Sequence, residues 1–336
     1  MTATIKDVAK MAGVSISTVS RVINDSKPVS PESRRKVLKA IDELQYEPNE
    51  IARSLVTKKS NIIGVIVNDI GKSYVSQVVR GIEEVGRMYN YDILLSSTYG
   101  DSEAETKYVK LLQQKQVEGI IIISEIHNAE LMEYLEAMRL PFVYLNRFYI
   151  IEKLPTVSIS NKKGAIKMTN HLVEQGHKKI AYISFDKDNG RNVELYKIEG
   201  YSEVMEGAGL NPMIINLPNT SPESYIDIMS KIIDKIKNNE ITAIFAHSDE
   251  SAIKIINLLY DEGIKVPEDV SVVGFSDIDM ASIYRPRLTS VKEPFYDYGA
   301  VSARRLLKEI SGEGTDEEKI YLPEYVIERE TVKKLD

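Results

Sequence analysis

The sequence contains no cysteine among its 336 residues. Disulfide bonds and thiolate metal sites are therefore excluded, and the absence fits a reducing compartment. The first ten residues, MTATIKDVAK, lack the apolar core of a signal peptide, and no stretch approaches the roughly 18 apolar residues that a membrane span needs. We therefore expect a cytoplasmic protein without a membrane partner.

Sequence motifs of catalysis and metal binding are missing as well. The four histidines are scattered and form no HExxH or comparable metal spacing; they are His127, His171, His177 and His247. There is neither a GxxxxGKS/T phosphate loop nor a GxSxG nucleophile elbow. We therefore predict that the protein is not an enzyme and uses no cofactor or metal ion.

Charge is distributed unevenly along the chain. Residues 1–60 hold 11 Lys and Arg against 7 Asp and Glu, a net charge of +4. The remaining residues hold 32 against 43, a net charge of −11. A basic head on an acidic body suggests that the head alone meets a polyanion. A segment of this charge is more often only a solvated surface, so the charge needs the support of a motif.

The hydrophobic pattern changes at Asn61. Residues 1–60 show only short helical patterns, whereas from Asn61 onward apolar runs typical of buried parallel strands alternate with helical patterns. The alternation occurs in residues 62–145 and again in residues 157–275. It predicts an α/β core of two doubly wound lobes with parallel sheets behind an all-helical head. Ligands of such sheets bind at the carboxyl ends of the strands, here in the cleft between the lobes.

The stretch DVAKMAGVSISTVSRVIN, residues 7–24, has the spacing of a helix-turn-helix. Ala9 is small where a second helix crosses, Gly13 tolerates the positive φ of a tight turn, and Val19 can face Ala9. The second helix begins with hydroxyl side chains followed by Arg21, which suit phosphate oxygens and base edges. Taken singly, these residues have simpler explanations, since Ser15 could only cap the helix and Arg21 could only be solvated. Together they favour DNA binding.

The segments TIKDVAKMAGVSISTVSRVIN and VSPESRRKVLKAIDELQYEPNEIARSL resemble the amino-terminal signature of the LacI/GalR family of bacterial transcription repressors. The likeness runs through residues 4–55, and the two-lobed body is similar to the periplasmic-binding-protein-like core of that family. The resemblance implies that Ile16 and Ser17 read bases. It implies a DNA interface made of Thr4, Ser15, Ile16, Ser17, Thr18, Ser20, Arg21, Asn24, Tyr46, Asn49, Ala52 and Leu55.

The same resemblance implies a hinge helix at Pro48–Leu55, with Leu55 wedged into the minor groove. Because a helix this short is marginal in water, we expect it to form only with DNA and a partner's hinge. Ordinary packing of Leu55 is the alternative. One head contacts few base pairs, which implies a homodimer on a pseudopalindromic operator. The implied domains are a helix-turn-helix domain at 1–47, a hinge and linker at 48–60, an N-terminal lobe at 61–160 plus 292–322, and a C-terminal lobe at 161–291 plus 323–336.

Family members usually bind a sugar or a purine in the cleft through an aspartate of a strand-end motif, GFDD or GYDD. This chain has Gly274-Phe-Ser276-Asp277 instead, and Lys197 stands where the family commonly has arginine. The resemblance implies effector contacts from Lys197, Ser276 and Asp277, with a sugar or a sugar phosphate as ligand. The two departures weaken the case for a simple sugar inducer.

The segments RPRLTSVKEPFYDYGAVSARRLLKEI and KQVEGIII resemble the catabolite control subgroup of this family in Gram-positive bacteria. The likeness implies a regulator, mainly a repressor, of carbon-source utilisation, and as partner the phosphocarrier HPr phosphorylated on serine. The implied partner surface is Asp69, Tyr296, Asp297, Arg304 and Lys308. Arg304 and Lys308 lie four residues apart on one helix face and suit a phosphate, although both could simply be solvated. Glu47 and Glu324 replace residues that tend to be basic in the subgroup, which would leave this surface altered or absent.

Two other functions are compatible with parts of the sequence. A local repressor of one sugar operon would take a small-molecule effector in the cleft and would need no partner protein. A sugar receptor without a DNA role would explain the core alone, but it leaves residues 1–60 unexplained and lacks the export signal that such receptors need.

Overall fold

The computed structural model describes residues 3–25, 27–46, 59–147, 154–185, 193–217, 222–314 and 319–335. The chain divides into two compact units, Met1–Ser60 and Asn61–Asp336. Each unit buries its own clusters of apolar side chains. The boundary coincides with the change of hydrophobic pattern at Asn61.

In the part of the first unit that is described, three helices form a small bundle. The helices are α1 (Ile5–Ala12), α2 (Ile16–Asn24) and α3 (Pro31–Leu44). Gly13 closes the turn after α1 with a φ of 65°, a conformation that glycine adopts without steric cost. Ala9 and Val19 are buried in the same cluster, as their spacing requires. The predicted helix-turn-helix is confirmed.

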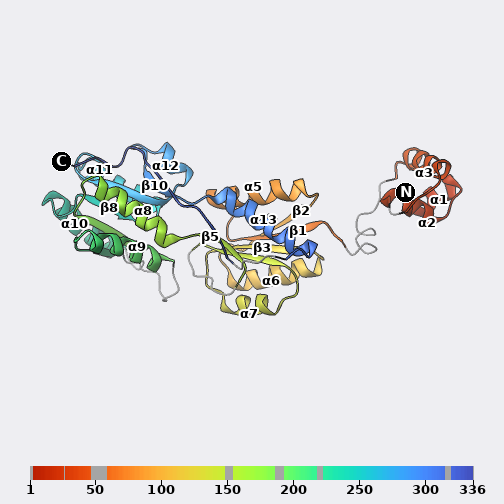
Figure 1. Ribbon diagram of the computed structural model, residues 1–336, viewed down its shortest axis with the longest axis horizontal. Coiled ribbons are helices and arrows are strands. Elements are labelled where there is room, and N and C mark those ends of the chain that lie inside the picture. The colour runs from red at the N-terminus through yellow and green to blue at the C-terminus, as the bar shows by residue number, and fades with distance from the viewer. Residues whose placement is uncertain are drawn as a thin grey trace. The chain divides into compact units, whose positions relative to one another are not determined.

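The second unit begins with a parallel four-stranded sheet in the order β2-β1-β3-β4. Its strands are β1 (Ile62–Val67), β2 (Asp92–Ser97), β3 (Gly119–Ser124) and β4 (Phe142–Asn146). One face is covered by α5 (Ser73–Met88) and α13 (Phe295–Ser311), the other by α6 (Ser102–Gln114) and α7 (Ala129–Ala137) (Figure 1). Because helices cover both faces, β1, β3 and β4 are almost wholly buried and nearly all apolar.

A second sheet has the strand order β12-β10-β9-β8-β6-β7. Its strands are β6 (Ile180–Phe185), β7 (Met213–Leu217), β8 (Ala243–Ala246), β9 (Ser271–Ser276), β10 (Thr289–Lys292) and β12 (Tyr325–Ile327). The accompanying helices are α8 (Asn161–Glu174), α9 (Glu194–Gly207), α10 (Pro222–Lys237), α11 (Asp249–Asp261) and α12 (Asp279–Ile283). The two doubly wound lobes are confirmed. One edge departs from a purely parallel sheet, since β12 returns antiparallel to β10.

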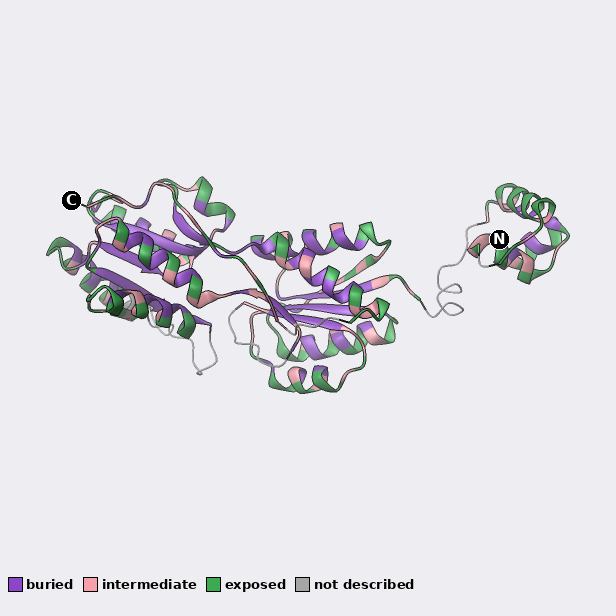
Figure 2. Cartoon of the chain, viewed as in Figure 1, coloured by how far each residue is buried: buried purple, intermediate pink, exposed green. Residues whose placement is uncertain are grey.

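The chain passes between the lobes after β5 (Thr156–Ile159), after β10 and after β11 (Lys319–Leu322). The strands β5 and β11 pair in parallel as a two-stranded sheet. Figure 2 shows the inner strands of both large sheets buried, while the helices expose one side. Among the described residues, none of the helices is long and apolar enough to span a lipid bilayer.

Helices α5 and α13 approach each other backbone to backbone. A Cβ atom on Gly81 would lie 2.2 Å from the carbonyl oxygen of Tyr296, and one on Gly299 would lie 1.9 Å from that of Val78. Both distances are far below van der Waals contact, so any side chain at either position would force the helices apart. Two segments more than 200 residues apart in the chain are thereby fixed against each other.

Candidate nucleic-acid interface and ligand pocket

Helix α2 begins with a cluster of hydroxyl groups. Ser15 Oγ accepts a hydrogen bond from the Thr18 amide at 3.1 Å and so caps the helix. The same oxygen lies 2.7 Å from Ser17 Oγ and 2.9 Å from Thr18 Oγ1. The simpler explanation, Ser15 as an N-cap, therefore accounts for its geometry. The cap orders a helix N-terminus at which hydroxyl and amide groups can meet phosphate oxygens.

The exposed side of α2 presents apolar, polar and cationic groups next to one another. Ile16 is 46% exposed, Ser17 and Arg21 are also exposed, and no ion pair of the described residues involves Arg21. The Asn24 side-chain amide donates to Ser20 O at 3.0 Å and to Ser20 Oγ at 3.3 Å, so this pair is held in place. An apolar side chain and an unpaired guanidinium on one helix suit thymine methyl groups and guanine edges in the major groove.

The other residues of the implied DNA interface differ in position. Thr4 closes the start of α1, because its amide and hydroxyl donate to Asp7 Oδ2 at 2.9 and 2.6 Å. Tyr46 packs against the core of the first unit. Asn49, Ala52 and Leu55 lie outside the described residues, as does the rest of the implied hinge helix.

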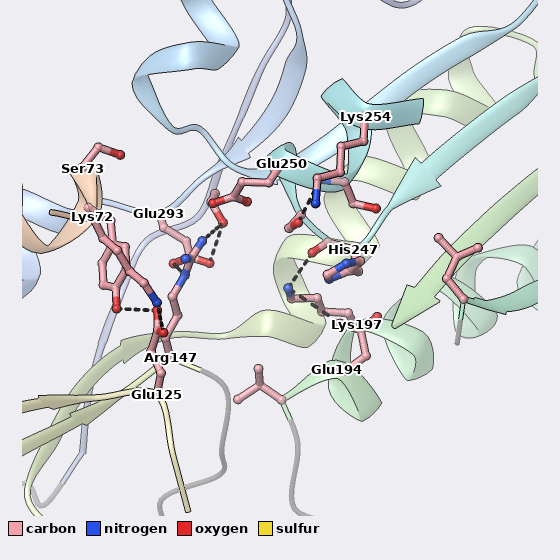
Figure 3. Close-up of a pocket in the computed structure, with 16 residues that line it drawn as sticks. Lys72, Ser73, Glu125, Arg147, Glu194, Lys197, His247, Glu250, Lys254 and Glu293 are labelled. Atoms are coloured by element: carbon pink, nitrogen blue, oxygen red, sulfur yellow. Dashed lines mark hydrogen bonds and ion pairs between the residues drawn. The ribbon is translucent and has the colours of Figure 1, made fainter. Parts of the chain in front are cut away.

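A pocket of about 480 Å³ lies in the second unit where strands of both sheets end (Figure 3). Glu125 and Arg147 directly follow β3 and β4, whereas His247 follows β8 and Ser276 ends β9. Its position and its volume are those of small-molecule sites in doubly wound proteins. The charged lining residues are Lys72, Glu125, Arg147, Glu194, Lys197, Glu250, Lys254 and Glu293. Across the described ranges, no group of three or more acidic or histidine side chains is arranged to hold a metal ion.

Glu125 is the centre of one wall. It accepts hydrogen bonds from Asn68 Nδ2 at 2.7 Å and from the Tyr74 hydroxyl at 2.6 Å, and it forms an ion pair with Lys72. Burial alone would raise the pKa of Glu125, but the bonds from Lys72 and Tyr74 outweigh it and the pKa lies below its ordinary value. Burial, with Glu125 beside it, raises the pKa of the Tyr74 hydroxyl. Glu125 is an ionised carboxylate whose acceptor positions are filled by the protein.

Arg147 spans the pocket from one lobe to the other. Its guanidinium lies over the rings of Tyr74, at 4.6 Å, and Phe295, at 5.6 Å. Its Nη2 donates to Ser276 Oγ at 2.9 Å, and its Nε lies 3.9 Å from Glu293 Oε2. Ring faces, a neutral hydroxyl and the carboxylate of Glu293 are therefore among the groups that hold this cation.

Lys197 projects from α9 on the opposite wall and is only 7% exposed. Its ammonium donates to His247 O at 2.9 Å and lies 4.1 Å from the centre of the Phe275 ring. Glu194 Oε2 is 3.9 Å away, and Glu194 accepts a hydrogen bond from the Tyr182 hydroxyl at 2.8 Å. Burial raises the pKa of Glu194, although Lys197 and the hydrogen bond from Tyr182 oppose the shift.

The chain turns sharply after β9. Ser276 has a φ of 130° and Asp277 a φ of 56°, a region that strains residues with a Cβ atom. Asp249 braces the turn, since its Oδ2 accepts a hydrogen bond from Ile278 N at 2.8 Å and its Oδ1 accepts one from Ser290 Oγ at 2.5 Å. The brace fixes the Ser276 hydroxyl in the pocket.

The residues expected to contact an effector do not all meet. Lys197 and Ser276 line the pocket, but Asp277 does not. Asp277 forms an ion pair with Arg329, whose Nη2 lies 2.6 Å from Asp277 Oδ1. The carboxylate therefore ties the turn to the segment that follows β12.

Sequence reasoning missed seven of the eight charged residues that line the pocket, all except Lys197. Glu125 and Arg147 had a usable signal, because each is the charged residue that follows a buried strand. The remaining five gave no such signal; they are Lys72, Glu194, Glu250, Lys254 and Glu293.

The surface implied for a partner protein lies mainly on α13. The Tyr296 hydroxyl donates to Glu84 Oε2 at 2.6 Å, while Asp297, Arg304 and Lys308 are exposed. Within the described ranges no ion pair involves Arg304 or Lys308. Asp69 stands in the loop before α5, where its Oδ1 accepts a hydrogen bond from Gly71 N at 2.8 Å.

Glu324 does not belong to an exposed surface, contrary to the expectation that it would alter the partner interface. It is only 6% exposed, accepts a hydrogen bond from Ser160 N at 3.0 Å, and lies 3.3 Å from Lys167 Nζ. Its carboxylate therefore connects the segment between β11 and β12, which passes from one lobe to the other, to α8 and the residue before it. Glu47 lies outside the described residues.

Comparison with known proteins agrees with this architecture. Residues 4–49 match the model of bacterial regulatory proteins of the lacI family, and residues 169–332 match the periplasmic binding protein-like domain. The transcriptional regulator RegA of Clostridium saccharobutylicum is 38% identical, with 99% of each chain covered. Catabolite control protein A of Priestia megaterium is 35% identical over 99% of this chain and 100% of its own.

Among solved structures, the lac repressor dimer bound to operator and the anti-inducer ONPF superposes with a TM-score of 0.83. It is 27% identical and the match covers 99% of this chain and all of that one. A helix-turn-helix unit in the same chain as a two-lobed core of doubly wound sheets defines a bacterial transcription regulator. The chain belongs to the lacI family of bacterial regulatory proteins and is a DNA-binding transcriptional regulator.

Proposed function

We propose that the protein binds a pseudopalindromic operator as a homodimer and that the occupancy of its pocket sets its affinity for the operator. The observation that carries this proposal is the exposed side of α2, where Ile16, Ser17 and Arg21 are available to base edges. Because one such helix reaches only a few base pairs, operator selection needs a second head. A polar small molecule in the pocket, a sugar or a sugar phosphate, would favour one arrangement of the lobes over another.

Operator selection can be tested by measuring binding of the full-length protein to operator-like and to random DNA as salt is raised. We expect operator-like DNA to bind at least 1,000-fold more tightly at physiological salt, and both affinities to fall steeply with salt because phosphate contacts release counterions. Equal affinity for both DNAs would contradict the proposal.

Replacing Arg21 with alanine is expected to weaken operator binding by about 1–3 kcal/mol while random DNA loses much less, because a guanidinium that reads a base carries specificity. Lys39→Ala is the matched control, since it also removes one positive charge from the head but from α3. The control should lower both affinities by the same factor. If the ratio of operator affinity to random-DNA affinity is the same in Arg21→Ala and Lys39→Ala, Arg21 reads no base.

A second proposal concerns control of carbon-source utilisation through HPr phosphorylated on serine. Its support is the exposed pair Arg304 and Lys308, which has the spacing to meet a phosphate from one face of α13. We expect the phosphorylated form of HPr, but not the unmodified form, to strengthen operator binding. Double replacement of Arg304 and Lys308 by alanine should abolish that gain, whereas the exposed Lys115→Ala should leave it intact. No gain with phosphorylated HPr would favour a local repressor that responds to its pocket ligand alone.

A further inference from the structure

Asn61, the first residue of the second unit, is held from both sides of β1. Its backbone amide donates a hydrogen bond to Glu118 Oε1 at 2.6 Å, and its carbonyl oxygen accepts one from Asp92 N at 2.8 Å. Asp92 begins β2 and Glu118 directly precedes β3, and these two strands are the neighbours of β1 in the sheet. The chain is therefore fixed at the point where it enters the lobe, one residue before β1 begins.

The backbone conformation of Asn61 shows the same constraint. Its φ is 52°, in the left-handed region that asparagine tolerates better than most residues with a Cβ atom. A residue outside regular structure keeps such a conformation only where its surroundings fix it. Here both backbone groups of Asn61 are bonded within the second unit, so the core sets the direction in which the chain leaves toward residue 60.

The carboxylate that holds Asn61 is itself held in place. The Tyr91 hydroxyl donates to Glu118 Oε2 at 2.9 Å, and the Glu118 amide donates to Ile62 O at 2.9 Å. Burial raises the pKa of the Tyr91 hydroxyl to about 12, and the hydrogen bond to Glu118 adds to the shift. Hydrogen bonds to a carboxylate are roughly twice as strong as those between neutral groups. Glu118 therefore bonds to two successive residues at the entry of the chain.

The residue that follows Glu118 lies against α13. A Cβ atom on Gly119 would be 2.8 Å from Leu306 Cδ1, so the leucine side chain fills the space that glycine leaves. Leu306 is fully buried in the core of the N-terminal lobe. Glu118 therefore stands on a packed part of the lobe, and its grip on Asn61 is a grip by the core itself.

We propose that Glu118 is a positioning residue for DNA binding, because its hold on Asn61 fixes where the chain leaves the core toward the helix-turn-helix unit. Two heads must meet two half-sites at a fixed separation. They bind more tightly when both chain exits are fixed beforehand, since less conformational entropy is lost on binding. One head on random DNA gains nothing from this. The inference rests on the proposed function, because it requires a homodimer on a pseudopalindromic operator.

The test compares full-length variants on an operator that the wild-type protein selects from a library of random DNA duplexes. Glu118→Ala removes the acceptor of the Asn61 amide. We expect its operator affinity to fall roughly tenfold or more, because the released residue must be ordered again in both subunits. Its affinity for random DNA should change less than about twofold, since the phosphate contacts of the head are untouched. Glu118→Gln should bind like the wild type, because its side-chain oxygen can accept from Asn61 N and its amide can donate to the Tyr91 hydroxyl.

The separation of the half-sites gives a readout that a merely structural role would not move. The wild type should lose affinity when base pairs are inserted between the half-sites, whereas Glu118→Ala, with freer chain exits, should lose a smaller factor. Asp269→Ala is the matched control, because Asp269 Oδ2 also accepts from a backbone amide, that of Lys265 at 2.8 Å, but in the C-terminal lobe. The control should keep both the affinity and the spacing preference of the wild type.

Three results would overturn the inference. They are wild-type operator affinity in Glu118→Ala, an equal loss on operator and random DNA, and an unchanged spacing preference. If Glu118→Ala does not fold, Tyr91→Phe takes its place. That variant removes the donor that orients the carboxylate and should lower operator affinity by a smaller factor, so unchanged affinity there would also overturn the inference. A wild-type protein that selects no sequence from the library would instead contradict the proposed function.

Discussion

Replacing Gly299 with alanine is expected to lower the free energy of unfolding of the second unit by about 3 kcal/mol, the upper part of the range for overpacked sites. The added Cβ would lie 1.9 Å from the carbonyl oxygen of Val78 and 2.8 Å from its carbonyl carbon. Both atoms belong to the backbone of α5, so no side chain can rotate away. Relief requires α13 to move, and its own side chains Phe295, Ala303 and Leu306, which are buried in the core of the lobe, resist that movement.

The measurement is denaturant-induced unfolding, followed by a signal from the second unit. Gly207→Ala is the matched control, because a Cβ atom at the end of α9 meets nothing within 4 Å and the change should be neutral or stabilising by up to about 1 kcal/mol. If both variants unfold at the same denaturant concentration, the close contact of α5 and α13 is not a rigid feature. If α13 shifts, operator binding by the variant should also no longer respond to phosphorylated HPr, since Arg304 and Lys308 lie on this helix.

Most of the architecture was predictable because it depends on local periodicity. The apolar runs predict strands because both faces of each sheet are buried, and the helical patterns between the runs predict the helices that cover those faces. Asn61 marks where this pattern begins. The helix-turn-helix was predictable for the same reason, since Gly13, Ala9 and Val19 meet requirements that arise within a dozen residues of one another. The antiparallel β12 was not predictable in this way, because its direction is set by the return of the chain from the other lobe.

The pocket was only partly predictable, because its interactions join residues distant in sequence. The hydrogen bond from Arg147 to Ser276 links positions 129 residues apart, and neither residue alone indicates the other. Asp277 shows the opposite error, since the motif predicts that it contacts an effector, whereas it pairs with Arg329. A positive φ at both Ser276 and Asp277 turns the two side chains in ways that strand alternation does not predict. The ends of the strands indicate where such a site lies, but only the fold shows which charged side chains line it.

Stability of the second unit is expected to fall as pH rises between about 4 and 7, and Asp249 is expected to cause a large share of that fall. Asp249 has no exposed surface, and burial raises its pKa from 3.8 to about 7 despite hydrogen bonds from Ser290 and Ile278. Below about pH 4 the carboxyl is protonated in both the folded and the unfolded chain, so its contribution to stability is fully present. Between the two pKa values only the unfolded chain loses the proton. The free energy of unfolding therefore decreases by roughly 4 kcal/mol across this window.

Asp249→Asn should flatten this dependence without disturbing the turn. Its carbonyl oxygen can accept from Ile278 N, and its amide can donate to Ser290 Oγ, as the protonated carboxyl would. Ser290 can then direct its own proton to Val291 O, an oxygen already 3.4 Å away. We therefore expect wild type and variant to be equally stable near pH 4, and the variant to be the more stable of the two at pH 8.

The comparison is made by denaturant unfolding at pH 4, 6 and 8, with Asp261→Asn as the control on the exposed end of the same helix. The control should follow the wild type at every pH. A difference between wild type and Asp249→Asn that stays constant from pH 4 to pH 8 would mean that Asp249 is ionised in the fold throughout. In that case the turn would be braced by a permanent charge.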